Sequence, residues 1–195
     1  MTDTVLKNGT VKLLKIDSII STGRLILRKF TNDDFADLCE MLYDPDVMYA
    51  WEHTFSETQA RELLERQFER YEETGVGFWA AIEKETGEMV GQIGLIWADI
   101  NGEKVLELAY MLKKIHWHKG FAVEGGKACL NYAFSKMGVD KIYAPIRPEN
   151  AASVKVAEKL GANADGECVK HYNGKDMLHL IYVMSPSKNQ PSHHF

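Results

Sequence analysis

Apolar residues recur at helical spacing in two segments near the start of the chain. Residues 56–75 form the clearer case, because their apolar side chains lie three or four positions apart, as in an amphipathic helix: Leu63, Leu64, Phe68 and Tyr71. This segment opens with the capping signal Ser–Glu–Thr–Gln and closes at Gly75. A second helix is predicted for residues 31–44, with acidic residues in its first turn and Pro45 after its end.

A different pattern, of short apolar runs separated by turn residues, begins after Gly75. Residues 77–100 predict a hairpin whose turn is Glu–Thr–Gly–Glu, and residues 104–112 predict the next strand. The same signals predict the remaining elements: strands at 24–30 and 140–146, helices at 119–134 and 149–161, and a closing hairpin at 166–184. The order β-α-α-β-β-β-α-β-α-β-β predicts an α/β sandwich in which helices pack on a mixed sheet.

Three glycines interrupt the helical pattern of residues 119–134, and each costs about 1 kcal/mol relative to alanine inside a helix. Gly120 stands at the helix start, where backbone N–H groups lack helical partners and the dipole is positive. A glycine there lets a phosphate approach these groups, and Lys119 adds charge; a plain β–α turn is the alternative. Gly125 and Gly126 would let the helix lie close against the strands.

Composition narrows the class of protein. The 195 residues are 45% hydrophobic, which predicts one domain with a proper core. The net charge of −5 argues against general nucleic-acid binding, and no apolar run approaches the roughly 18 residues of a membrane span. The N-terminus lacks the apolar block of a signal peptide. Cys39, Cys129 and Cys168 lack the spacing of a disulfide or metal site, which favours a cytoplasmic location.

One segment resembles the acetyl-CoA motif of the GNAT superfamily of N-acetyltransferases; it reads ELAYMLKKIHWHKGFAVEGGKACLNYAF. The ribosomal-protein-alanine N-acetyltransferase-like branch is the most similar, because its Trp-x-Lys-Gly-x-Ala pattern is matched by Trp117, Lys119, Gly120 and Ala122. A second motif, RPENAASVKVAEKLGA, resembles the family's Asn-x-x-Ser helix with its Glu-Lys-Leu-Gly ending. The resemblance covers about residues 22–184 and implies a GNAT-like fold: a mixed, mostly antiparallel sheet flanked by helices on both faces.

The resemblance implies that acetyl-CoA is the cosubstrate. Its pyrophosphate would lie on backbone N–H groups of the loop that follows Trp117: those of His118, Lys119, Gly120, Phe121 and Ala122. The pantetheine arm would pair with the strand end at Met111 and Leu112, where a backbone N–H would also polarise the thioester carbonyl. Asn150 would bind the arm through its side-chain amide or cap the helix that follows, and the two roles are compatible.

The implied reaction is acetyl transfer to a primary amine by direct attack in a ternary complex. A lysine-like amine, with a reference pKa of about 10.4, must first lose a proton. Glu107 is the candidate base; its alternative role is that of a solvent-facing or ion-paired strand residue. The thiolate, with a reference pKa of about 8.5, leaves tolerably without full protonation. Ser153 is the candidate proton donor, and helix capping is its alternative role.

Three positions depart from the family pattern. Ala109 replaces a common glycine, Ala157 stands near the place of a tyrosine acid, and Ala162 replaces an aromatic residue. These departures leave open a second hypothesis, an acyl-CoA-binding sensor or scaffold without turnover. A nucleotide-binding protein is a third hypothesis, which lacks the acidic ribose-binding residue expected after a Rossmann glycine motif.

The acceptor amine stays open among a protein N-terminus, a polyamine, an amino sugar and a small metabolite. The acidic surface mildly favours a cationic acceptor through electrostatic steering. The resemblance implies an acceptor pocket at residues 48–55, whose wall would include Tyr49, Trp51, Glu52 and His53. No metal, nucleic-acid or membrane partner is expected, and a homodimer is a possibility that the resemblance adds.

We expect a division of the chain into three parts. Residues 1–21 would form an N-terminal extension, residues 22–184 a single acetyltransferase domain, and residues 185–195 a polar tail.

Overall fold

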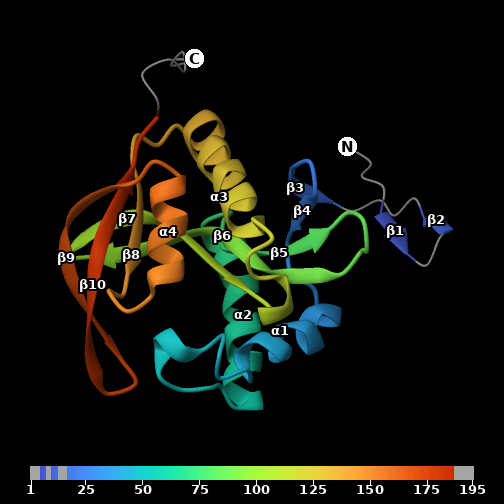
Figure 1. Ribbon diagram of the computed structural model, residues 1–195, viewed down its shortest axis with the longest axis horizontal. Coiled ribbons are helices and arrows are strands. Elements are labelled where there is room, and N and C mark those ends of the chain that lie inside the picture. The colour runs from blue at the N-terminus through green and yellow to red at the C-terminus, as the bar shows by residue number, and fades with distance from the viewer. Residues whose placement is uncertain (1–4, 8–9, 13–16, 187–195) are drawn as a thin grey trace.

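The structure is a computed structural model that describes residues 5–7, 10–12 and 17–186 (Figure 1). Its strands are β1 (Val5–Lys7), β2 (Thr10–Lys12), β3 (Ser18–Ser21), β4 (Leu25–Arg28), β5 (Phe78–Glu83), β6 (Met89–Ile100), β7 (Glu103–Leu112), β8 (Ile142–Ile146), β9 (Asn163–Tyr172) and β10 (Lys175–Met184). Its α-helices are α1 (Phe35–Leu42), α2 (Glu57–Glu73), α3 (Phe121–Tyr132) and α4 (Ala151–Lys159). Short helical turns are η1 (Asn32–Asp34), η2 (Tyr49–Trp51), η3 (Lys114–His116) and the π-helical η4 (Ala133–Met137). The predicted order of elements from residue 24 onward is confirmed.

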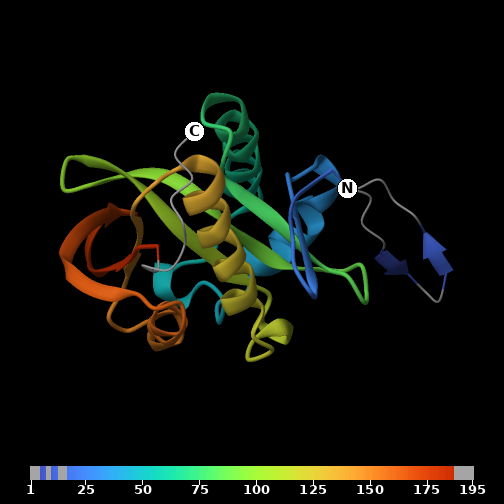
Figure 2. The same ribbon diagram turned by 90° about the horizontal axis from the view of Figure 1, so that it is seen from above.

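One eight-stranded sheet organises the domain, in the order β3-β4-β5-β6-β7-β8-β10-β9. Neighbouring strands are antiparallel, except that β7 and β8 run parallel. Figure 2 shows α1 and α2 on one side of this sheet and α3 with α4 on the other. The predicted mixed, mostly antiparallel sheet with helices on both faces is therefore confirmed. None of the helices in the described part of the chain is long and apolar enough to cross a membrane.

Part of the predicted N-terminal extension belongs to this sheet. Strand β3 pairs with β4 at one edge, whereas β1 and β2 form a separate two-stranded sheet. The division into parts at residues 21 and 184 stays a prediction. Most of the predicted tail, residues 187–195, lies outside the described residues.

The core lies between the sheet and its two helical layers. Its largest fully buried side chains include Trp79, Phe121, Leu27, Leu38 and Ile93. Helix α2 begins at the predicted signal: the Ser56 side chain accepts a hydrogen bond from the Gln59 N–H, and the Ser56 N–H donates to the Gln59 Oε1. For α2, the capping residues and the spacing of apolar residues in the sequence therefore predict the helix that packs on the core.

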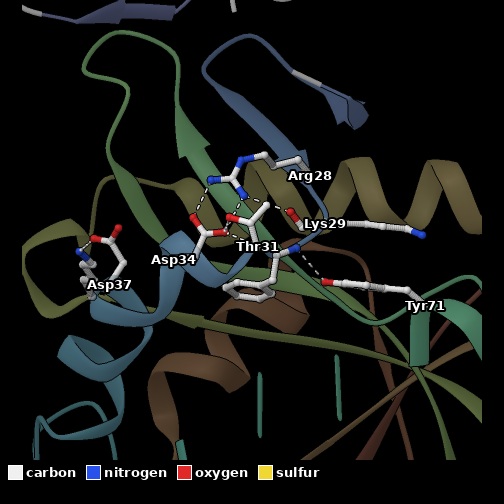
Figure 3. A network of polar contacts seen from close by, with 8 residues as sticks. Arg28, Lys29, Thr31, Asp34, Asp37 and Tyr71 are labelled. Atoms are coloured by element: carbon white, nitrogen blue, oxygen red, sulfur yellow. Dashed lines mark hydrogen bonds and ion pairs between the residues drawn. The ribbon is translucent and has the colours of Figure 1, made fainter. Parts of the chain in front are cut away.

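A partly buried ion pair ties the start of α1 to strand β4 (Figure 3). The two Nη atoms of Arg28 donate to the two carboxylate oxygens of Asp34, at 2.7 and 2.6 Å. The Thr31 N–H donates to the same carboxylate at 2.8 Å. Burial alone would raise the pKa of Asp34, but the bonds from Arg28 and Thr31 outweigh it and lower that pKa.

Helix α3 packs unusually close to the sheet, and its two inner glycines explain how. A Cβ atom added to Gly125 would stand 2.4 Å from Cδ1 of Ile93 on β6. One added to Gly126 would stand 3.0 Å from Cδ1 of Leu160, just beyond α4. The prediction that these glycines allow close helix–strand packing is confirmed.

Candidate active site

The sheet opens between its two parallel strands. Strands β7 and β8 form one pair, Glu107 opposite Tyr143, although β7 continues to Leu112. Beyond this pair the carboxyl ends of the strands diverge within the described chain. Because α3 follows β7 and α4 follows β8, the N-termini of both helices lie at this opening. A site at the carboxyl ends of parallel strands is a common place for ligands in α/β folds.

The register of β7 decides which backbone groups face the opening. The Lys113 N–H donates to the Val90 carbonyl at 2.9 Å, so this pair is hydrogen-bonded across β6 and β7. Antiparallel hydrogen-bonding alternates, so the N–H and C=O of Met111 point toward β6. Those of Tyr110 and Leu112 point toward β8. Of the two residues predicted at this strand end, Leu112 therefore offers a backbone N–H, and Met111 contributes its buried side chain.

The loop from β7 to α3 carries the predicted pyrophosphate site. The Trp117 indole Nε1–H donates to the Leu112 carbonyl at 2.9 Å, which fixes the loop against the strand end. His118 and Gly120 adopt positive φ values of 61° and 83°. Within the described chain, no acceptor is found for the backbone N–H groups of residues 118–122, and Gly120 supplies no capping side chain. Free backbone donors at the positive end of a helix are suited to binding an anion.

Charged side chains surround this loop. The Lys119 Nζ lies 3.5 Å from Nδ1 of the buried His116, and burial together with Lys119 lowers the pKa of that histidine. The Arg24 Nη1 donates to the Lys119 carbonyl at 2.9 Å, and its guanidinium lies 4.6 Å from the Phe121 ring centroid. The space over Gly120 is otherwise open, since the nearest atom to an added Cβ is Nη2 of Arg24 at 3.5 Å.

Arg24 is a site residue that sequence reasoning missed. Its Nε donates to the Glu124 carboxylate at 2.6 Å, and the Thr22 hydroxyl donates to the same carboxylate at 2.6 Å. Burial would raise the pKa of Glu124, but the bonds from Thr22 and Arg24 lower it. This ion pair joins the residue just before β4 to the first turns of α3 across 100 positions of sequence. The signal available in the sequence was the position of Arg24 in the motif TGRLILRKF, which opens the domain.

Asn150 and Ser153 lie together at the start of α4. The Asn150 Oδ1 accepts from the Ser153 N–H at 3.0 Å, which confirms its capping role, and from the Tyr49 hydroxyl at 2.7 Å. The Asn150 Nδ2 amide and the Ser153 hydroxyl have no hydrogen-bond partner among the described residues. The Tyr110 hydroxyl donates to the Ser153 carbonyl at 3.1 Å, bridging the opening from β7 to α4; burial raises the pKa of Tyr110 to about 12.

Glu107 faces the opposite side of the sheet from Tyr110, as the strand alternation predicts. It is buried, and its Oε1 accepts from Lys170 Nζ on β9 at 2.6 Å. The Arg70 guanidinium on α2 is close enough for this carboxylate to act on its pKa. Glu107 thus lies between the sheet and α2, at the point where β7 and β8 separate.

The segment between α1 and α2 reaches the same side of the sheet. Glu52, at a positive φ of 59°, forms ion pairs with Arg147 at 2.9 Å and Lys175 at 2.8 Å. The pair with Lys175 first, and that with Arg147 second, lower the pKa of Glu52. The His53 ring lies 5.2 Å from that of Tyr172 on β9. The predicted pocket wall is therefore linked to the β9–β10 hairpin rather than only packed between helices.

Other candidates have ordinary structural roles. Cys129 is fully buried in α3, and burial raises the pKa of its thiol far above the ordinary range, as expected of a core residue. Ala157, which stands near the expected place of a tyrosine acid, is buried. No cluster of three or more metal-ligating side chains occurs in the described ranges.

Comparison with known proteins connects this geometry to a family. Residues 24–163 match the sequence profile of the acetyltransferase (GNAT) domain. The chain is 38% identical over 141 residues to the uncharacterized protein YkkB of Bacillus subtilis (strain 168), a match that covers 72% of this chain and 82% of YkkB. It is 30% identical over 171 residues to the uncharacterized N-acetyltransferase p20 of Bacillus licheniformis, covering 87% of this chain and 96% of p20.

Solved structures share the fold. An acetyltransferase (GNAT family) from Bacillus anthracis superposes with a TM-score of 0.71 at 26% identity, covering 85% of this chain and 97% of that one. At lower identity, a ribosomal-protein-S5-alanine acetyltransferase from Vibrio fischeri gives 0.68 at 16%, covering 88% and 98%. A spermidine N-acetyltransferase from Vibrio cholerae in complex with CoA and spermine gives 0.66 at 21%, covering 83% and 95%. The predicted resemblance is confirmed: the chain belongs to the GNAT family of acetyl-CoA-dependent acetyltransferases.

Proposed function

We propose that this enzyme transfers the acetyl group of acetyl-CoA to a primary amine, of a small molecule or a protein N-terminus, by direct attack in a ternary complex. The observation that carries this proposal is the opening between β7 and β8, with unpaired backbone donors at its edge and the N-terminus of α3 at its mouth. A thioester in that opening is reachable by an amine from the side of the sheet that faces α2.

The cofactor contacts follow from the free donors. The N–H groups of residues 118–122 would bind the pyrophosphate, with Lys119 adding positive charge and Trp117 holding the loop in place. Backbone groups of Tyr110 and Leu112 would pair with the amides of the pantetheine arm as an added strand. The Asn150 Nδ2 amide would donate to a carbonyl of the arm, because Oδ1 is already committed to the helix cap.

Two groups would stabilise the products of attack. The Leu112 N–H would donate to the developing oxyanion, since it points into the opening with no partner in the described part of the sheet. The Ser153 hydroxyl would protonate the departing thiolate from the first turn of α4. With a buried alanine at position 157, no tyrosine on that helix competes for this role.

Glu107 would remove the proton of the attacking amine through a water molecule. Its ion pair with Lys170 keeps the carboxylate oriented, and its second oxygen, Oε2, makes no hydrogen bond within the described chain. We assign general-base assistance of the usual size, about 10² to 10⁴-fold.

The cytoplasm remains the proposed location, which the three free cysteines support. A homodimer remains a prediction, which light scattering of the purified protein would test.

The experiment is an acetylation screen of peptides, polyamines and aminoglycosides, read by release of the CoA thiol, together with calorimetric titration of acetyl-CoA. We expect saturable turnover with at least one amine class. Binding of acetyl-CoA without turnover on any amine would instead support the acyl-CoA sensor. Absence of binding would contradict the cofactor assignment itself.

A further inference from the structure

Positive charge gathers where the acceptor would enter, although the chain as a whole is acidic. The pairing of β8, β9 and β10 places Glu107, Lys170 and His179 on one face of the sheet. This is the face toward α2, because the Glu107 carboxylate is close enough to act on the pKa of Arg70 on that helix. Arg66 lies one helical turn before Arg70, and its positive charge acts to lower the pKa of both Arg70 and Tyr172.

The cations in this region differ in whether they form an ion pair with a carboxylate. Lys170 is matched by Glu107 at 2.6 Å. Arg147 and Lys175 share Glu52, and Arg147 also approaches Glu149 at 3.3 Å. Arg66 and Arg70 form no direct ion pair with any carboxylate among the described residues.

Arg70 is the less ordinary of the two. It is half-buried, and among the described residues its guanidinium makes one hydrogen bond, a long one from Nη1 to Gln67 Oε1 at 3.4 Å. Burial first, and repulsion from Arg66 second, lower the pKa of Arg70. A ligand carboxylate would stabilise a half-buried guanidinium that lacks a direct carboxylate partner. Planar guanidinium groups bind carboxylates with two parallel hydrogen bonds.

We infer that the acceptor carries a carboxylate on the same molecule as its reactive amine, with Arg70 and Arg66 binding the carboxylate while the amine lies toward Glu107. This inference rests on the proposed function, because it names the substrate class of the same site. It reverses the expectation from net charge, since local cations govern docking within a Debye length of about 8–10 Å. A purely cationic acceptor, such as a polyamine, would lack the carboxylate that this inference requires.

The test compares amines of equal length and different charge. ω-Amino acids from β-alanine to 6-aminohexanoate would each be assayed beside the corresponding amide and the corresponding diamine. A second series of peptides would carry Asp, Asn or Lys after the same first residue, and a third would pair ethanolamine with its phosphate ester. We expect a carboxylated amine to exceed its amide by about 10- to 100-fold in kcat/KM, as a charged hydrogen-bond pair would give. Preference for the phosphate ester with no carboxylate preference would overturn the choice of carboxylate.

Variants assign the preference to the two arginines. Arg66→Gln combined with Arg70→Gln should remove most of the preference through KM, while acetyl-CoA affinity and the melting temperature stay near wild type. Arg66→Glu, at an exposed position, should shift preference toward the diamine even if the double variant folds poorly. The matched control is Arg61→Gln on the same helix, where the exposed Arg61 pairs with Glu57 and should leave the preference unchanged.

The outcomes separate the two proposals. Equal turnover of carboxylates, amides and diamines at every length would overturn this inference and leave the acetyltransferase proposal standing. Binding of acetyl-CoA without turnover of any amine would refute both.

Discussion

Replacing Gly125 with alanine should destabilise the protein, although alanine is the better helix former. Alanine in a helix interior is favoured over glycine by about 1 kcal/mol. The added Cβ, however, would stand 2.4 Å from Cδ1 of Ile93, whose side chain is fully buried under α3. Overpacking of this kind costs about 1–3 kcal/mol. We therefore expect a net loss of up to about 2 kcal/mol, or several degrees in Tm for a chain of this size.

A second substitution isolates the cause. Ile93→Val removes the Cδ1 atom, after which the nearest atoms to the new Cβ are at 3.4 and 3.6 Å, ordinary contact distances. The valine alone should cost about 0.5–1.5 kcal/mol. In that background, Gly125→Ala should become stabilising by about 1 kcal/mol. The coupling free energy between the two sites would then equal the relieved overpacking, about 1–3 kcal/mol.

The assay is urea unfolding of the four proteins of this cycle, followed by circular dichroism. Gly126→Ala is the matched control, because its Cβ would meet Leu160 Cδ1 at a milder 3.0 Å. That variant should lie near wild type. A Gly125→Ala protein more stable than wild type, or a coupling energy of zero, would refute the argument that close packing explains this glycine.

Three further outcomes follow from the site and its supports. Glu107→Gln should lower kcat by about 10²-fold at neutral pH and recover part of it at high pH, where the amine deprotonates itself; a pH–rate profile like that of wild type would make Glu107 structural. Ser153→Ala should lower kcat a few-fold with unchanged acetyl-CoA affinity by calorimetry, and an equal kcat would remove Ser153 from the mechanism. The pKa of Asp34 is lowered in the fold, so its pair with Arg28 stabilises the protein above the unfolded pKa of about 3.8 and this stability is lost as pH falls through the folded pKa. Melts from pH 6 to pH 2 should show a shallower decline for Asp34→Asn than for wild type; parallel declines would contradict this assignment.

The order of elements was predictable because its signals are local. The capping residues of α2 and the turn residues of the β5–β6 and β9–β10 hairpins act within a few positions of sequence. The loop and helix start around Gly120 were also predictable, since the motif there is continuous, and their role in binding phosphate stays a prediction. The close packing at Gly125 was anticipated from the cost of glycine in a helix, and the structure supplies its reason in Ile93.

The parts of the candidate site that the sequence did not predict depend on contacts between distant segments. Glu107 meets Lys170 across 63 positions, and Arg24 meets Glu124 across 100, and no sequence pattern couples such pairs. The orientation of the Tyr110 backbone depends on the hydrogen-bonding phase between β6 and β7, which alternation of side chains alone does not reveal. Net charge averages over the surface, so it favours a cationic acceptor without locating Arg70, on which the inference of a carboxylated acceptor rests.

Binding of acetyl-CoA to two matched valine variants tests the central claim most directly. Gly120 and Gly138 both adopt a positive φ, 83° and 68°, at the two ends of the same helical segment, and an added Cβ would clash at neither: it would meet only Arg24 Nη2 at 3.5 Å at Gly120 and nothing within 4 Å at Gly138. Valine should therefore strain both turns by a similar amount, about 1–2 kcal/mol. Calorimetry should show acetyl-CoA affinity falling by about tenfold or more for Gly120→Val alone, because only that side chain would occupy the phosphate site. Equal affinities in two folded variants would contradict the assignment of the α3 N-terminus as the cofactor site.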